Sequence, residues 1–196
     1  MSEIKNGITA IAARNRKDWR KWLAKNHASE QAVWLIIYHK SSKTPSIYYD
    51  EAVEEALCFG WIDSKPNKRD GESYYQYFAV RKAKSKWSKA NRERAERMIA
   101  SGFMTPAGQT MIDLAKKTGT WDALIEVQNA VIPDDLKKLF NKNKNALKNF
   151  EAFPPSSKRI ILEWISNAKK PETRALRIQQ AVEQAALNIK ANHYRQ

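Results

Sequence analysis

The chain has 196 residues, enough for one domain or for two small units that each bury a core. Hydrophobic residues make up 42% of the sequence and aromatic residues 10%, which excludes an intrinsically disordered chain. The formal net charge is +14, and a single cysteine, Cys58, excludes an intramolecular disulfide.

The first half of the sequence predicts a small sheet packed against helices. Asn15 is a suitable N-cap for a helix over residues 16–27. The apolar run Val33–Tyr38 predicts a buried strand and is far too short to span a bilayer. Residues 47–49 predict a short edge strand, and a second helix is expected over residues 50–59.

Gly60 stands where a left-handed C-cap would end this second helix. Residues 61–64 and 74–80 predict two further strands joined by a polar turn. Together these elements predict an antiparallel sheet of three or four strands with helices on one face. The acidic side chains of the second helix are expected on its solvated outer face: Asp50, Glu51, Glu54 and Glu55.

From residue 88 onward the apolar residues recur with the period of a helix. Ser88 and Thr105 are suitable N-caps, and Pro171 starts the last helix. That helix carries an apolar seam for packing against other helices: Ala175, Ile178, Val182, Ala185 and Ile189. The sequence therefore predicts an α+β fold with a sheet subdomain over residues 1–87 and an all-helical subdomain over residues 88–196.

Three short stretches hold the excess of positive charge. Residues 81–97 carry a net charge of +6, residues 137–148 carry +5, and residues 158–177 carry +4. Cations gathered in this way indicate a surface for an anionic partner.

The segment from Arg81 to Ser88 leaves a strand and enters a helix N-terminus. Free backbone N–H groups and nearby cations favour an anion there, and Trp87 offers a ring for stacking. Arg81 is a better anchor than its lysine neighbours because a guanidinium can bind a phosphate or a carboxylate with two parallel hydrogen bonds. The alternative is a solvated loop before an ordinary serine cap.

Cys58 lies near the end of the second expected helix, and Asp63 lies in the strand expected directly after it. A nucleophilic cysteine needs a base, but the histidines His27, His39 and His193 are not adjacent to it in the sequence, so a buried structural thiol is the favoured interpretation. No histidines or cysteines are paired at the spacing of metal ligands. We therefore expect no catalytic residue, no metal and no cofactor.

The chain resembles the YdeI/OmpD-associated family, whose members are also labelled bacteriocin-protection proteins. The resemblance rests on five ordered motifs at residues 19–23, 49–63, 81–91, 102–108 and 164–177. The family name implies a role in protection against bacteriocins and an association with an outer-membrane porin. The family also resembles small YdhG-like α+β domains, which agrees with the predicted sheet subdomain. This sequence begins without a secretory signal, so we expect a cytoplasmic protein that does not insert into a membrane.

The first hypothesis is a non-enzymatic stress or protection protein that binds an anionic small molecule or polyanion at a basic, tryptophan-lined site. The second hypothesis is non-specific nucleic-acid binding, and the third is an enzyme acting on a small anionic substrate. The expected ligand-binding residues are Trp61, Asp63, Arg81, Ser85, Trp87, Asn91, Arg174 and Arg177.

Overall fold

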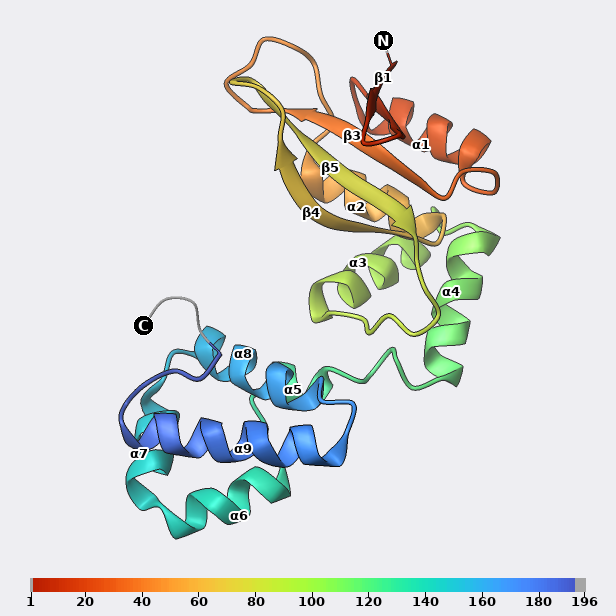
Figure 1. Ribbon diagram of the computed structural model, residues 1–196. Coiled ribbons are helices and arrows are strands. Elements are labelled where there is room, and N and C mark those ends of the chain that lie inside the picture. The colour runs from red at the N-terminus through yellow and green to blue at the C-terminus, as the bar shows by residue number, and fades with distance from the viewer. Residues whose placement is uncertain (1, 193–196) are drawn as a thin grey trace. The chain divides into compact units, whose positions relative to one another are not determined.

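The computed structural model describes residues 2–192 (Figure 1). The chain divides into two compact units between Asp122 and Ala123. Unit 1 contains a mixed sheet with helices and unit 2 is helical, which confirms the α+β class expected from the sequence. No helix within the described residues is long and apolar enough to cross a membrane.

The sheet of unit 1 has five strands in the order β1-β2-β3-β5-β4. The strands are β1 (Ser2–Lys5), β2 (Ile8–Ala12), β3 (Ala32–Tyr38), β4 (Trp61–Lys68) and β5 (Ser73–Val80). All neighbours pair antiparallel except β2 and β3, which pair in parallel. The expectation of a purely antiparallel sheet is corrected here, because α1 (Arg16–Asn26) crosses over between β2 and β3 and returns the chain in the same direction.

Two other expectations for the sheet are also corrected. Residues 47–49 form no strand: Ile47 is buried in the core, and Tyr49 begins α2 (Tyr49–Cys58). The hairpin of β1 and β2 was not expected from the sequence. It turns at Asn6 and Gly7, whose φ angles are 51° and 75°. An Asn-Gly pair is a strong hairpin signal, because both turn residues need positive φ.

The helices α1 and α2 lie on one face of the sheet (Figure 1). Asn15 caps α1 by accepting a hydrogen bond from the backbone N–H of Asp18 at 2.9 Å. Trp19 and Leu23 fall on the inner face of α1 and are fully buried. Gly60 ends α2 with a φ of 75°, as its position in the sequence predicts.

Two further helices complete unit 1, α3 (Lys89–Ala100) and α4 (Pro106–Lys117). Their inner residues join the same core as the sheet and α2: Ala95, Met98, Ile112 and Ala115. The helical period that begins at residue 88 predicts a boundary after residue 87. The division found in the structure comes after α4, because α3 and α4 pack on α2.

Unit 2 contains five helices within its described residues. They are α5 (Ile125–Gln128), α6 (Asp134–Lys142), α7 (Lys144–Ala152), α8 (Pro155–Ser166) and α9 (Pro171–Ala186). Phe140 and Phe150 pack against each other with ring centroids 5.0 Å apart at the centre of its core. Ile178, Val182 and Ala185 of the expected α9 seam are buried there. Ala175 and Ile189 are exposed instead, and Ile189 lies beyond the end of α9.

Candidate functional site

Arg81 is the first residue after β5, and its side chain turns into the core of unit 1. Only 4% of the residue is exposed. Its guanidinium carbon lies 3.9 Å from the ring centroid of Trp87, and the ring of Trp87 packs in turn on Trp121. The loop of residues 82–86 therefore carries its cations outward, while the arginine before it is enclosed.

The buried guanidinium of Arg81 is only partly hydrogen-bonded. Its Nη2 donates to the carbonyl oxygen of Lys86 at 2.7 Å and to that of Ser85 at 3.5 Å. Its Nε and Nη1 are buried and have no hydrogen-bond partner. Burial lowers the pKa of Arg81 to about 10, and the negative charge of Asp63 opposes this shift. The chain thus encloses a cation that lacks partners for three of its five N–H groups.

Asp63 lies on β4 and is half-buried. Its carboxylate accepts a hydrogen bond from the hydroxyl of Tyr49 at 2.6 Å. Burial and this carboxylate raise the pKa of Tyr49, because both disfavour the phenolate. The negative charge of Asp63 favours the charged form of Arg81, but the two side chains form no ion pair within the described residues. Asp63 therefore contacts one of a group of tyrosines near the start of α2, and it acts on the buried arginine through its charge alone.

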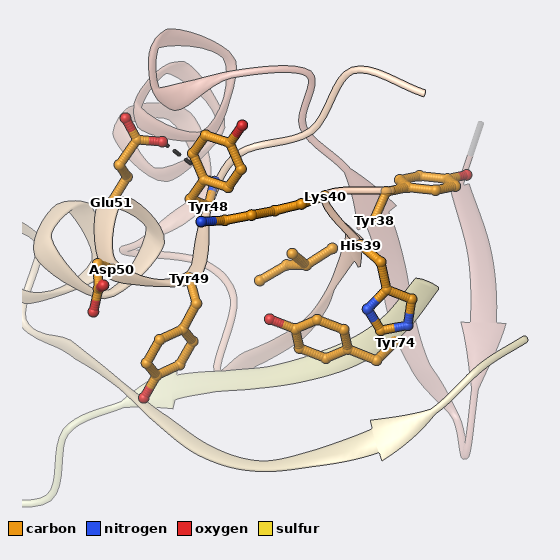
Figure 2. A pocket seen from close by; sticks show the side chains of 9 residues that line it. Tyr38, His39, Lys40, Tyr48, Tyr49, Asp50, Glu51 and Tyr74 are labelled. Carbon is orange, nitrogen blue, oxygen red and sulfur yellow. Dashed lines mark hydrogen bonds between the residues drawn. The ribbon is translucent and has the colours of Figure 1, made fainter. Parts of the chain in front are cut away.

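These tyrosines surround a cavity of about 520 Å³, which we call the tyrosine pocket. Figure 2 shows the Lys40 side chain running toward the ring of Tyr48, and the rings of His39 and Tyr74 beside each other. The backbone N–H of Tyr48 donates to Glu51 at 3.2 Å, so this carboxylate is occupied in capping α2. The lining residues are Ile37, Tyr38, His39, Lys40, Tyr48, Tyr49, Asp50, Glu51 and Tyr74.

A second cavity of about 440 Å³ adjoins the tyrosine pocket and shares Tyr49 and Tyr74 with it. Its other lining residues are Ser64, Pro66 and Gln76 of the neighbouring strands. Neither cavity was expected from the sequence. The available signal was the pair Tyr48-Tyr49 directly before a helix, together with tyrosines on the strands that face it.

The expected tryptophan lining is corrected by the structure. Trp61 is 1% exposed and Trp87 is 2% exposed, so both rings belong to the core of unit 1. Ser85 contributes its backbone carbonyl to Arg81. Asn91 lies in the first turn of α3 and accepts a hydrogen bond from Arg94 at 3.0 Å. Of the six expected residues of unit 1, only Ser85 and Trp87 contact the buried Arg81, so these residues do not line an open tryptophan cleft.

Arg174 and Arg177 lie on α9 of unit 2 and have partners there. Arg174 binds Asp135 with two hydrogen bonds of 2.6 and 3.0 Å, and this arginine lowers the pKa of the carboxyl. Arg177 donates to the carbonyl oxygen of Trp164 at 2.5 Å and lies over its ring. Both arginines thus stabilise contacts between helices within unit 2.

Cys58 ends α2 and is fully buried. Burial and the nearby Glu55 raise the pKa of its thiol to about 11. His27 packs on Phe59, His39 lies at the tyrosine pocket, and His193 lies outside the described residues. We therefore interpret Cys58 as a structural thiol.

We expect Cys58 to react slowly with a thiol reagent at pH 8 in the native protein and rapidly in 8 M urea. Both the enclosed position and the raised pKa keep the thiolate scarce below about pH 11. Absorbance of the released thiolate of Ellman's reagent measures the rate. Complete labelling of native protein within the dead time of mixing would contradict this interpretation.

Among residues 2–192, no group of three or more His, Cys, Asp and Glu side chains is placed to hold a metal ion. The acidic side chains at the start of α2 are engaged with cations instead. Asp50 binds Arg94 at 2.6 Å, and Glu54 binds both Arg16 and Arg97 at 2.9 Å. The groups present at the candidate site are a buried guanidinium, tyrosine hydroxyls, Lys40, His39 and the carboxylates of Asp50, Glu51 and Asp63.

These features define a two-unit α+β protein with cationic loops and a tyrosine-lined pocket. Residues 11–111, more than half of the chain, match the family model "Domain of unknown function (DUF8412)". Residues 129–188 match the family model "Bacteriocin-protection, YdeI or OmpD-Associated". The chain belongs to the first of these families, and residues 129–188 of its second unit are similar to the YdeI/OmpD-associated family.

The motif at residues 164–177 lies within the YdeI/OmpD-associated match, which confirms the resemblance seen in the sequence. The four earlier motifs, from residue 19 to residue 108, lie within the match to the domain of unknown function. Comparisons with curated proteins and with solved structures gave no significant match.

Proposed function

We propose that this protein is a non-enzymatic, cytoplasmic protein of the bacteriocin-protection type that binds an anionic ligand, with Arg81 as the anchor. The observation that supports this proposal is the guanidinium of Arg81, buried with Nε and Nη1 unpartnered. An anionic oxygen would supply the acceptors that these nitrogens lack.

An enclosed cation without a full set of partners is unfavourable for folding. Removing an ion from water costs several kcal/mol, and only hydrogen bonds and an opposite charge offset this cost. Arg81 has two carbonyl acceptors, one ring to stack on and the distant charge of Asp63. A site that is strained when empty and satisfied when filled is typical of a binding site, because the ligand recovers the missing interactions.

Access to Arg81 runs through the loop of residues 82–86. This loop closes over the guanidinium with its backbone carbonyls, while Lys82 and Lys84 are exposed. We propose that these cations attract the anion and that the loop shifts to admit it. Tyr49 and Asp63 would then couple the anion to the tyrosine pocket, where the rest of the ligand would lie.

Replacing Arg81 by methionine tests this proposal. We expect the free energy of unfolding without ligand to change by less than about 1 kcal/mol, since removal of an unpaired buried charge offsets the lost hydrogen bond to Lys86. Differential scanning fluorimetry with inorganic phosphate, pyrophosphate, citrate and ATP measures binding. The wild type should gain about 2.7 kcal/mol at an anion concentration of 100 times Kd, and Arg81→Met should gain nothing.

Lys84→Gln is the matched control, because it removes one exposed cation from the same loop and leaves the guanidinium in place. This variant should keep most of the stabilisation by the anion. The proposal fails if none of the four anions stabilises the wild type more than it stabilises Arg81→Met.

A further inference from the structure

The sheet of unit 1 has a second face, opposite to its helices, that carries its own side-chain cluster. The cluster consists entirely of strand residues, and its aromatic members are Trp34, Tyr38, Tyr75 and Tyr77. We call it the aromatic face. The helices α1 and α2 lie on the other side of the strands (Figure 1).

The pairing of β3 with β5 places these rings side by side. Trp34 of β3 lies opposite Tyr77 of β5. Ile36, two residues after Trp34, lies opposite Tyr75. The ring centroids of Trp34 are 4.8 Å from Tyr77 and 5.9 Å from Tyr75, both in edge-to-face contact. Tyr38, Tyr75 and Tyr77 are only half-buried. The aromatic face therefore presents a row of tyrosine rings on a rigid central pair of strands.

One polar group on this face lacks a partner. Trp34 is 7% exposed, and its indole Nε1 is buried without a hydrogen-bond acceptor. The ammonium of Lys5 lies above it, 5.4 Å from the ring centroid of Trp34 and 4.1 Å from that of Tyr75. Lys5 reaches these rings from β1, the outermost strand, so an anion that attracts this long side chain would uncover them.

Cations border the aromatic face on both edges of the sheet. Lys5 lies on β1, and Lys65 is exposed on β4, the opposite edge strand. Residues 1–122 carry 22 Lys and Arg against 14 Asp and Glu, a net charge of +8. Glu3, an acidic residue on β1, is occupied by Arg69 and by the hydroxyl of Tyr75.

We propose that the aromatic face binds single-stranded nucleic acid. Sheets that bind single strands stack bases on half-exposed aromatic rings while cations hold the phosphates, and this face combines both features. Bases would stack on Tyr75 and Tyr77, and Lys5 would move from the rings to a phosphate. A duplex keeps its bases stacked inside and would bind through charge alone. This surface is separate from Arg81. The guanidinium of Arg81 stacks on Trp87, which belongs to the core between the sheet and its helices.

Fluorescence anisotropy with labelled 12-nucleotide oligouridine, oligothymidine and a duplex of equal length tests the proposal. The wild type should bind both single strands more tightly than the duplex, with an affinity that falls as salt is raised from 50 to 200 mM. Tyr77→Ser should weaken single-strand binding at least about fivefold, since one stacked base contributes that much or more. Phe103→Ser, which removes an exposed aromatic ring beside Arg20 of α1 and away from this face, should bind like the wild type.

Arg81→Met should also bind like the wild type, so failure of the anion-site proposal and failure of this one are distinguishable. The proposal is overturned if the wild type does not bind single strands in 50 mM salt, or if Tyr77→Ser binds them as tightly as the wild type does.

Ultraviolet crosslinking of the wild type to oligouridine, followed by peptide mass spectrometry, locates the contact without any substitution. Crosslinks on residues 32–38 and 73–80 would support the aromatic face. Crosslinks confined to the basic stretches of unit 2, residues 137–148 and 158–177, would overturn the proposal and assign nucleic-acid binding to the helical unit instead.

Discussion

Gly108→Ala should destabilise unit 1 by about 3 kcal/mol. Gly108 lies in the first turn of α4, where this helix meets the end of α2. A Cβ atom at this position would overlap the carbonyl oxygen of Cys58, and it would lie 2.5 Å from the sulfur of Met104. Overpacking against a backbone carbonyl costs about 1–3 kcal/mol or more, because neither helix can retreat without breaking other contacts.

The carbonyl group of Cys58 cannot move easily, because it is hydrogen-bonded to Thr105, the N-cap of α4. It accepts hydrogen bonds from the backbone N–H of Thr105 at 3.2 Å and from its hydroxyl at 2.5 Å. Helix propensity alone predicts the opposite sign, since alanine is favoured over glycine by about 1 kcal/mol inside a helix. The measured sign therefore decides whether close packing of α2 and α4 or local propensity dominates.

Urea unfolding followed by tryptophan fluorescence measures this change. Gly71→Ala is the matched control, because no heavy atom lies within 4 Å of a Cβ at that position. Its free energy of unfolding should stay within about 0.5 kcal/mol of the wild type. A Gly108→Ala variant as stable as the wild type would show that α4 does not approach α2 as closely as described.

Glu55→Gln should lower the free energy of unfolding by about 2–3 kcal/mol. Glu55 is 1% exposed, and its two carboxylate oxygens accept hydrogen bonds from Arg16 Nε at 2.5 Å and from Arg20 Nη1 at 2.6 Å. Breaking a buried pair by neutralising one member costs about 3–5 kcal/mol. We expect a smaller cost because both arginines retain partial contact with water, which solvates the charges left behind.

This carboxylate connects helices that are distant in the sequence. Arg16 and Arg20 belong to α1, while Glu55 belongs to α2, and Arg20 also donates to the carbonyl of Phe103 beyond α3. Urea unfolding again provides the measurement. Glu96→Gln, an exposed carboxylate on α3, is the control and should change stability by less than about 0.5 kcal/mol. Equal effects of the two substitutions would contradict a special role for Glu55.

Glu55 also illustrates what a sequence pattern cannot decide. The acidic residues of α2 were expected on a solvated outer face, and Asp50 is exposed there. Glu55 is instead buried, because α1 packs on α2 and supplies two arginines that pair with its charge. The helical period of α2 was correctly predicted, but which polar position would be covered depends on a helix about 35 residues earlier in the chain.

The candidate site shows the same division. Arg81 was expected as an anchor from its residue type and its place before a helix N-terminus. Its burial, its stacking on Trp87 and its unpartnered nitrogens depend on how Trp87 and Trp121 pack beside the end of β5. The tyrosine pocket was not expected, because its lining comes from β3, α2 and β5, which only the folded chain brings together.

Features that depend on near neighbours in the chain could be predicted from the residues alone. Asn15, Ser88 and Thr105 cap their helices as predicted, and Gly60 ends α2, since a cap needs only a side chain within three residues or a permitted φ. The parallel pairing of β2 with β3, the place where unit 1 ends and the burial of Arg81 became visible only in the folded chain. These features depend on contacts between segments far apart in sequence, whose packing no local pattern encodes.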